Sequence, residues 1–128
     1  YGSNLHQEQM KKRCSGCKYL KKYILQDYRL TFRSELCVAD IEYKKGSSVQ
    51  GALYEITEKD ESCLDKYEDF PILYKKIFFK YEDKDVMAYS MEKKTTFKYP
   101  STRYLNIIKQ GYKDCGLDTN FLIEALKG

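Results

Sequence analysis

The chain opens with a turn, Tyr1-Gly2-Ser3-Asn4-Leu5, and this turn constrains the fold most because four further short motifs follow it in one order. A Gly-Ser-Asn turn offers backbone N–H groups and short polar side chains, which suits the binding of an oxyanion or a carboxylate. Each motif alone is weak evidence, whereas the ordered set over nearly the whole chain is strong evidence. The later motifs are Gly51-Ala52-Leu53-Tyr54, Leu64-Asp65-Lys66-Tyr67-Glu68, Tyr74 and Pro100-Ser101-Thr102-Arg103-Tyr104.

Length and composition predict one globular domain. The 128 residues fit a single domain, residues 1–128, and the 42% hydrophobic and 33% charged content argues against disorder. No apolar run approaches the roughly 18 residues of a membrane helix, so we expect no membrane association. No signal peptide is visible, and an odd number of cysteines, five, favours reduced thiols and a cytoplasmic location.

The net charge of +4 raises a rival hypothesis, because the basic excess gathers early in the chain. A basic cluster can form a nucleic-acid-binding surface. Acidic and basic residues alternate elsewhere, which favours a solvated face, and no single-strand stacking motif appears. We therefore expect no nucleic-acid partner, and the mild positive charge favours an anionic small substrate. The early basic residues are Lys11, Lys12, Arg13, Lys18, Lys21 and Lys22.

Few side chains are suited to metal or nucleotide chemistry. His6 is the only histidine, so a catalytic triad would have to use it, and a histidine-rich metal site is excluded. Cys14-Ser15-Gly16-Cys17 is a CxxC, but zinc needs two further ligands at similar spacing, so we expect plain packing for Cys14. No glycine-rich phosphate-binding motif occurs. We expect neither a metal nor a cofactor.

The apolar spacing and the cap residues predict a mixture of strands and helices. Thr57 with Asp60 three residues later resembles a capping box, and Asn4 or its neighbour is expected to cap the first helix. Residues 45–48 are expected to stop one strand before the next. The order of elements predicts an α+β fold with a largely antiparallel or mixed sheet. The predicted helices are 5–13, 58–67, 101–112 and a short one after Asp118, and the predicted strands are 23–32, 37–43, 49–56, 72–81 and 86–97.

The ordered motifs, together with Met10 and Arg13-Cys14 after the first turn, resemble the γ-glutamylcyclotransferase family. The resemblance implies an α+β fold in which helices flank a small, mixed, partly closed β-barrel, with a cavity at one barrel mouth. In the family a strand precedes the turn, so we expect the N-terminal strand to be truncated here. A small-molecule γ-glutamyl substrate and a monomer or homodimer are also expected.

The reaction that the resemblance implies turns a γ-glutamyl amide into 5-oxoproline and a free amine or amino acid. The substrate's α-amino group is the nucleophile, so geometry alone can supply up to roughly 7–11 kcal/mol of the barrier. The resemblance makes Glu68 the catalytic proton shuttle, although other acids, such as Asp65 and Asp69, lie nearby in the chain. The substrate-binding residues that it implies are Tyr1, Gly2, Ser3, Asn4, Tyr74 and Tyr104.

Three alternatives stay open at the level of sequence. Tyr74 and Tyr104 could be core tyrosines with satisfied hydroxyls. The family usually has Gly after the catalytic Glu, whereas Asp69 stands here, which favours a non-catalytic binder of a γ-glutamyl or carboxylate metabolite as the rival function. The Tyr-Gly-Ser-Asn-Leu form of the turn is similar to the γ-glutamyl-amino-acid branch, whereas Tyr-Gly-Thr-Leu marks the amine branch and Tyr-Gly-Ser-Leu the glutathione-degrading branch. The identity of the leaving amine stays open.

Overall fold

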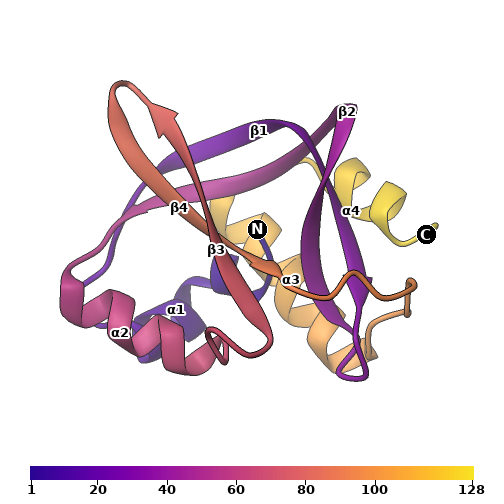
Figure 1. The fold of residues 1–128 in the computed structure, drawn as a ribbon, viewed down its shortest axis with the longest axis horizontal. Coiled ribbons are helices and arrows are strands. Elements are labelled where there is room, and N and C mark those ends of the chain that lie inside the picture. Colours follow the sequence, from indigo (N-terminus) through magenta and orange to yellow (C-terminus); the bar gives the residue numbers. More distant parts are fainter.

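The computed structural model describes residues 1–128 and has the α+β architecture that the sequence predicts (Figure 1). Two long hairpins cross one another, and helices cover their sides, with the N-terminus in the middle of the molecule. The elements are η1 (Ser3–Leu5), α1 (Gln7–Arg13), β1 (Lys18–Arg33), β2 (Val38–Glu55), α2 (Glu58–Tyr67), β3 (Tyr74–Tyr81), β4 (Lys84–Met91), α3 (Thr102–Cys115) and α4 (Thr119–Ala125).

β1 and β2 form one long antiparallel hairpin, so the prediction of two strands interrupted at residues 45–48 is wrong. The pairing passes from Tyr28 opposite Tyr43 to Gln26 opposite Ser48, which leaves residues 44–47 as a bulge. Asp27 adopts a φ of 63°, and its Oδ1 accepts a hydrogen bond from the Gly46 N–H at 3.0 Å. This side-chain acceptor replaces the missing ladder bond, so the strand bends and continues.

β3 and β4 form the second antiparallel hairpin, and β4 ends at Met91 rather than near residue 97 because its partner β3 begins opposite, at Tyr74. The two hairpins are separate two-stranded sheets. They meet where the Met91 N–H donates to Asp40 Oδ1 at 2.7 Å and Ser90 Oγ donates to the Ile41 carbonyl at 2.9 Å. The barrel is therefore only partly closed, and side chains rather than a shared ladder join its halves.

The helix caps follow the sequence closely. The Thr57–Asp60 capping box is present, and Ser101 and Asp118 cap α3 and α4. The exception is α1, where the His6 Nδ1 accepts from the Gln9 N–H at 3.2 Å, so the cap lies two residues beyond Asn4. Residues 3–5 instead form the short η1, which leaves Asn4 free to face the cavity described below.

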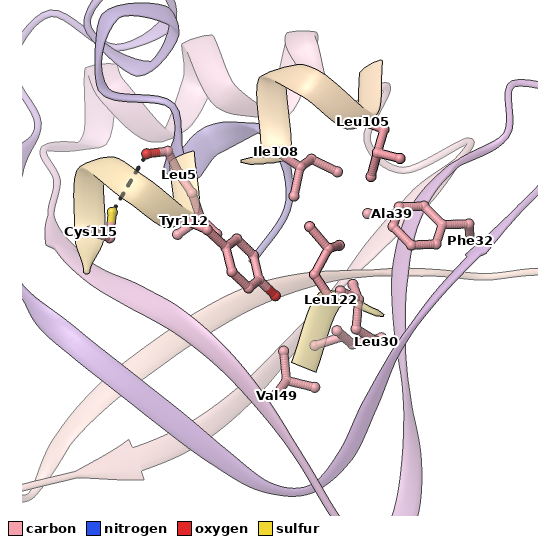
Figure 2. Packing of buried hydrophobic residues seen from close by; sticks show 11 residues of the cluster. Leu5, Leu30, Phe32, Ala39, Val49, Leu105, Ile108, Tyr112, Cys115 and Leu122 are labelled. Atoms are coloured by element: carbon pink, nitrogen blue, oxygen red, sulfur yellow. Dashed lines mark hydrogen bonds between the residues drawn. The ribbon is translucent and has the colours of Figure 1, made fainter. Parts of the chain in front are cut away.

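Two apolar clusters form the core. The larger cluster lies between α3, α4 and the β1–β2 hairpin, and it includes Leu5 from the N-terminal turn and Tyr112 from α3 (Figure 2). The smaller cluster packs α1 and α2 against the β3–β4 hairpin, and it contains the buried Cys14, as expected for a packing residue. None of the helices is both long enough and apolar enough to cross a membrane.

Candidate functional site

All seven residues that the sequence singles out line one cavity of about 920 Å³. The cavity lies between the two hairpins and α2. Its wall near the centre of the molecule combines the N-terminal turn, the end of α2, the start of β3 and the start of α3. The residues concerned are Tyr1, Gly2, Ser3, Asn4, Glu68, Tyr74 and Tyr104.

Glu68 is the half-buried C-cap residue of α2. Its Oε1 accepts a hydrogen bond from Asn4 Nδ2 at 3.3 Å. Burial raises the pKa of the Glu68 carboxyl above its ordinary value, while the nearby Arg13 guanidinium and the Asn4 hydrogen bond oppose the rise. A carboxyl group whose pKa is raised holds a proton more readily than an ordinary glutamate, which suits it both to accept a proton and to return it.

Asp69 follows Glu68 with a φ of 54°, which lies in the left-handed region. Glycine adopts this conformation without steric cost, and Asp and Asn adopt it more readily than other residues. The backbone therefore makes the turn after α2 with Asp at the position where the resemblance implies Gly. In this structure the substitution leaves Glu68 at the cavity wall.

The N-terminal turn presents unpaired donors. The N–H groups of Gly2, Ser3 and Asn4 have no hydrogen-bond acceptor within the protein, as expected at the start of a helical turn. A side chain at Gly2 would sit 3.1 Å from Ala39 Cβ and 3.5 Å from the Tyr104 hydroxyl. This close approach explains why the position carries Gly, and the turn can act as a small anion-binding nest.

Tyr74 and Tyr104 both contact the backbone of Ala39, but in opposite directions. The Tyr74 hydroxyl donates to the Ala39 carbonyl, whereas the Tyr104 hydroxyl accepts from the Ala39 N–H at 3.1 Å. The Tyr104 proton thus stays available to a ligand, while Tyr74 retains only acceptor capacity. Burial raises the pKa of Tyr104 to about 12 and that of Tyr74 further, so both phenols are neutral at neutral pH.

Tyr1 lines the cavity, and its hydroxyl donates to the Tyr89 carbonyl of β4 at 2.8 Å. This bond ties the start of the turn to the second hairpin. Tyr54 supports the turn from the other side, because its hydroxyl donates to the Asn4 carbonyl at 3.0 Å. The turn is therefore held between both hairpins before any ligand binds.

Two supporting residues were not predicted as part of the site. Arg13 contacts both Ser3 and Asn4, and Tyr54 contacts Asn4. The signals were present in the sequence, because Arg13-Cys14 and Gly51 to Tyr54 are among the ordered motifs. Nothing in their spacing indicates that their side chains converge on the turn. No three His, Cys, Asp or Glu side chains lie together in a way that could hold a metal ion.

Comparison with known proteins places this geometry in a family. The family described as "Gamma-glutamyl cyclotransferase, AIG2-like" matches residues 1–111. A solved structure called "Gamma-glutamyl cyclotransferase" is 25% identical, with a TM-score of 0.77 over 98% of this chain and 82% of that one. The uncharacterized human protein loc79017 is 26% identical, with the same TM-score and coverage.

YkqA from Bacillus subtilis has the same fold at 20% identity, with a TM-score of 0.78 over 97% of this chain and 50% of that one. No match to a curated protein sequence was found. The family match covers the N-terminal turn, α2 with Glu68, β3 and most of α3, which are the segments that build the cavity wall. The chain belongs to the AIG2-like gamma-glutamyl cyclotransferase family.

Proposed function

We propose that the protein is a γ-glutamylcyclotransferase that converts a γ-glutamyl amide into 5-oxoproline and a free amine, with Glu68 as the proton shuttle. One observation carries the proposal: a half-buried carboxyl with a raised pKa lies at the same cavity wall as three unpaired backbone N–H groups. An intramolecular acyl transfer requires a base and, close to it, hydrogen-bond donors that stabilise the oxyanion.

The proposed reaction needs no nucleophile from the protein. The α-amino nitrogen of the substrate attacks the γ-carbonyl carbon, a new C–N bond closes the five-membered ring, and the bond to the leaving nitrogen breaks. Glu68 takes the proton that the α-amino group loses and returns a proton to the leaving nitrogen. General acid–base catalysis of this kind contributes about 10²–10⁴-fold, and the held geometry of the substrate contributes the rest.

In this proposal each of the remaining site residues binds a different polar group of the substrate. The N–H groups of Gly2, Ser3 and Asn4 stabilise the oxyanion or hold the α-carboxylate. The free proton of Tyr104 suits the carboxylate, and the acceptor oxygen of Tyr74 suits the amine. Loss of one oxyanion donor typically costs about 2.7–4 kcal/mol of transition-state stabilisation.

The leaving group would occupy the rest of the cavity, where 21 of the 31 lining residues are hydrophobic. This lining accommodates the apolar part of an amine or an amino acid. The form of the N-terminal turn supports the amino-acid branch, which would give the protein a place in the metabolism of γ-glutamyl compounds such as glutathione. A cytoplasmic location and a monomeric or homodimeric state remain parts of the proposal.

The test is 5-oxoproline release from a panel of γ-glutamyl amides whose leaving groups are amino acids, the dipeptide of glutathione and simple amines. Wild type is compared with Glu68→Gln and with Glu61→Gln, a control carboxylate that also lines the cavity. We expect release that requires Glu68 and survives the Glu61 change. Ligand binding without release in wild type would favour the non-catalytic binder instead. Turnover by Glu68→Gln at the wild-type rate would remove Glu68 from the mechanism.

A further inference from the structure

Arg13 does not line the cavity, but it contacts Ser3 and Asn4, which do. Its Nη1 donates to Ser3 Oγ at 3.1 Å and to Asn4 Oδ1 at 2.7 Å. Its Nη2 donates to Gln9 Oε1 at 2.7 Å, which anchors the guanidinium on its own helix. The guanidinium carbon also lies 3.8 Å from the centre of the Tyr67 ring, one residue before Glu68. One planar group therefore bridges the turn, α1 and the end of α2.

The contact with Asn4 determines which way the Asn4 amide faces. A guanidinium has only donors, so the amide group must present its oxygen to Arg13 and its nitrogen to the other side. On that other side Asn4 Nδ2 donates to Glu68 Oε1 at 3.3 Å. The orientation of the hydrogen bond to Glu68 thus depends on Arg13, two contacts away.

Arg13 also sets the local charge. Its positive charge opposes the burial that raises the pKa of Glu68. The phenols that face Glu68 are neutral at neutral pH, since a phenol ordinarily has a pKa of about 10 and burial raises the pKa of each of these further. Arg13 is thus the one side chain whose positive charge opposes the rise of the Glu68 pKa, and the Tyr1 amino group acts in the same direction. The other groups that face Glu68 are the Tyr1 amino group and the phenols of Tyr1, Tyr74, Tyr89 and Tyr104.

We propose that Arg13 is a positioning residue of the cyclotransferase site. It orients the Asn4 amide toward Glu68 and stabilises the ionised form of the Glu68 carboxyl, and it does so without touching the substrate. The inference rests on the proposed function for its catalytic part. The two effects of Arg13, its positive charge and the geometry of its planar guanidinium, can be separated by substitution. Lys keeps the charge but cannot hold Ser3, Asn4 and Gln9 with one planar fork, whereas Gln removes the charge.

The experiment compares wild type, Arg13→Lys and Arg13→Gln, with Lys12→Gln as a control that removes a neighbouring exposed charge. The Glu68 carboxyl is titrated by ¹³C NMR, and kcat/KM for 5-oxoproline release is measured across pH. We expect Arg13→Gln to move the Glu68 titration and the acid limb of the profile to higher pH. Arg13→Lys should titrate close to wild type but lose activity by about 100-fold, the usual scale for a misplaced catalytic group.

Thermal unfolding of each variant shows whether it is folded. A folded Arg13→Gln whose Glu68 titrates as in wild type would overturn the proposal, as would an Arg13→Lys with wild-type kcat/KM. If Arg13→Gln does not fold, the Arg13→Lys result decides alone. If wild type releases no 5-oxoproline from any substrate, the proposed function fails. The NMR titration still tests the effect of Arg13 on Glu68 in that case, so the two failures are distinguishable.

Discussion

At the scale of single residues, the site depends on the direction in which each group donates its proton. Tyr74 and Tyr104 share the Ala39 backbone, yet only Tyr104 keeps a hydroxyl proton for a ligand. No sequence pattern predicts this difference, because both residues are tyrosines beside a cavity. It follows from which backbone group of Ala39, the carbonyl or the N–H, faces each ring.

If the proposed function holds, Tyr104→Phe should raise KM more than it lowers kcat, because the hydroxyl proton that is lost would bind the substrate away from the reacting atoms. We expect a KM increase of about tenfold, corresponding to one hydrogen bond to a charged group of about 1.5–3 kcal/mol, weakened by solvent. Steady-state kinetics on the best substrate of the panel measure both constants. An unchanged KM would return Tyr104 to the role of a core tyrosine.

Glu68 should cost the protein stability at neutral pH, which is a separate prediction from its role in turnover. The folded-state pKa of Glu68 is raised by burial, so ionisation is harder in the folded than in the unfolded state. The protonated Glu68 carboxyl therefore stabilises the fold fully below the unfolded-state pKa of about 4.3, and this stabilisation is lost as pH rises through the folded-state pKa. Glu68→Gln should unfold at a higher temperature than wild type at pH 7, with the gap narrowing toward pH 4.

Glu61→Gln is the control for this comparison, because Glu61 accepts a hydrogen bond from Lys76 at 2.6 Å and should lose rather than gain stability when neutralised. Thermal melts of both variants from pH 4 to pH 8 supply the data. A Glu68→Gln variant that is less stable than wild type at pH 7 would show that the ionised carboxylate is well solvated or well paired.

At the scale of elements, the sequence predicts best where a local rule is decisive. The capping box fixes the start of α2 at Glu58, and Ser101 fixes the start of α3. Predictions from the sequence are wrong where the side chain that ends a strand or caps a helix is not the one that the local pattern indicates. Gly46 looks like a strand stop until the Asp27 carboxylate accepts its N–H, and Asn4 looks like a helix cap although His6 takes that position.

The site shows the same division. The turn, Glu68, Tyr74 and Tyr104 could be predicted because the motifs that carry them resemble those of a known family. The contacts of Arg13 and Tyr54 with Asn4 could not be predicted, because these residues lie 9 and 50 positions from Asn4 in the sequence. Such convergence depends on the crossing of the hairpins, which local patterns do not encode.

The packing of α3 against the N-terminal turn gives a prediction at this scale. A side chain at Gly111 would lie 2.6 Å from Leu5 Cβ and 2.7 Å from the His6 backbone nitrogen, so the helix touches the turn through this glycine. Gly111→Ala gains about 1 kcal/mol in helix propensity but incurs overpacking of about 1–3 kcal/mol or more, because backbone atoms cannot move aside.

After the gain in helix propensity is subtracted from the overpacking cost, we expect Gly111→Ala to lower the free energy of unfolding by up to about 2 kcal/mol. It should also reduce kcat/KM, because the displaced turn carries Gly2, Ser3 and Asn4. Urea unfolding and the 5-oxoproline assay measure the two effects. Lys109→Ala, an exposed change on the same helix, should leave both near wild type. Equal stability of Gly111→Ala and wild type would mean that α3 does not hold the turn in place.

At the scale of the whole molecule, the cavity lies between two hairpins that are joined at separate places. At the tip of the β3–β4 hairpin, Lys21 Nζ donates to the Tyr81 hydroxyl at 2.8 Å and Tyr23 stacks on Phe79. At the end of β4 the join is Asp40, whose side chain is fully buried and contacts Arg33 of β1. Its Oδ2 lies 3.1 Å from Arg33 Nε and 2.9 Å from Lys94 Nζ, and its Oδ1 accepts from the Met91 N–H. The preceding residue is Ala39, whose backbone contacts the hydroxyls of Tyr74 and Tyr104.

Asp40→Ala should therefore destabilise the fold by up to about 3–5 kcal/mol, because it removes a buried carboxylate and leaves the Arg33 guanidinium with Glu42 as its remaining ionic partner. Arg33→Met combined with Asp40→Leu removes both charges, and we expect this pair to be less destabilised than Asp40→Ala alone. Urea unfolding of Arg33→Met, of Asp40→Leu and of the pair gives the coupling free energy. Strictly additive losses would show that the hairpins are joined by apolar packing, and that the Asp40 ion pairs contribute no coupling to the join.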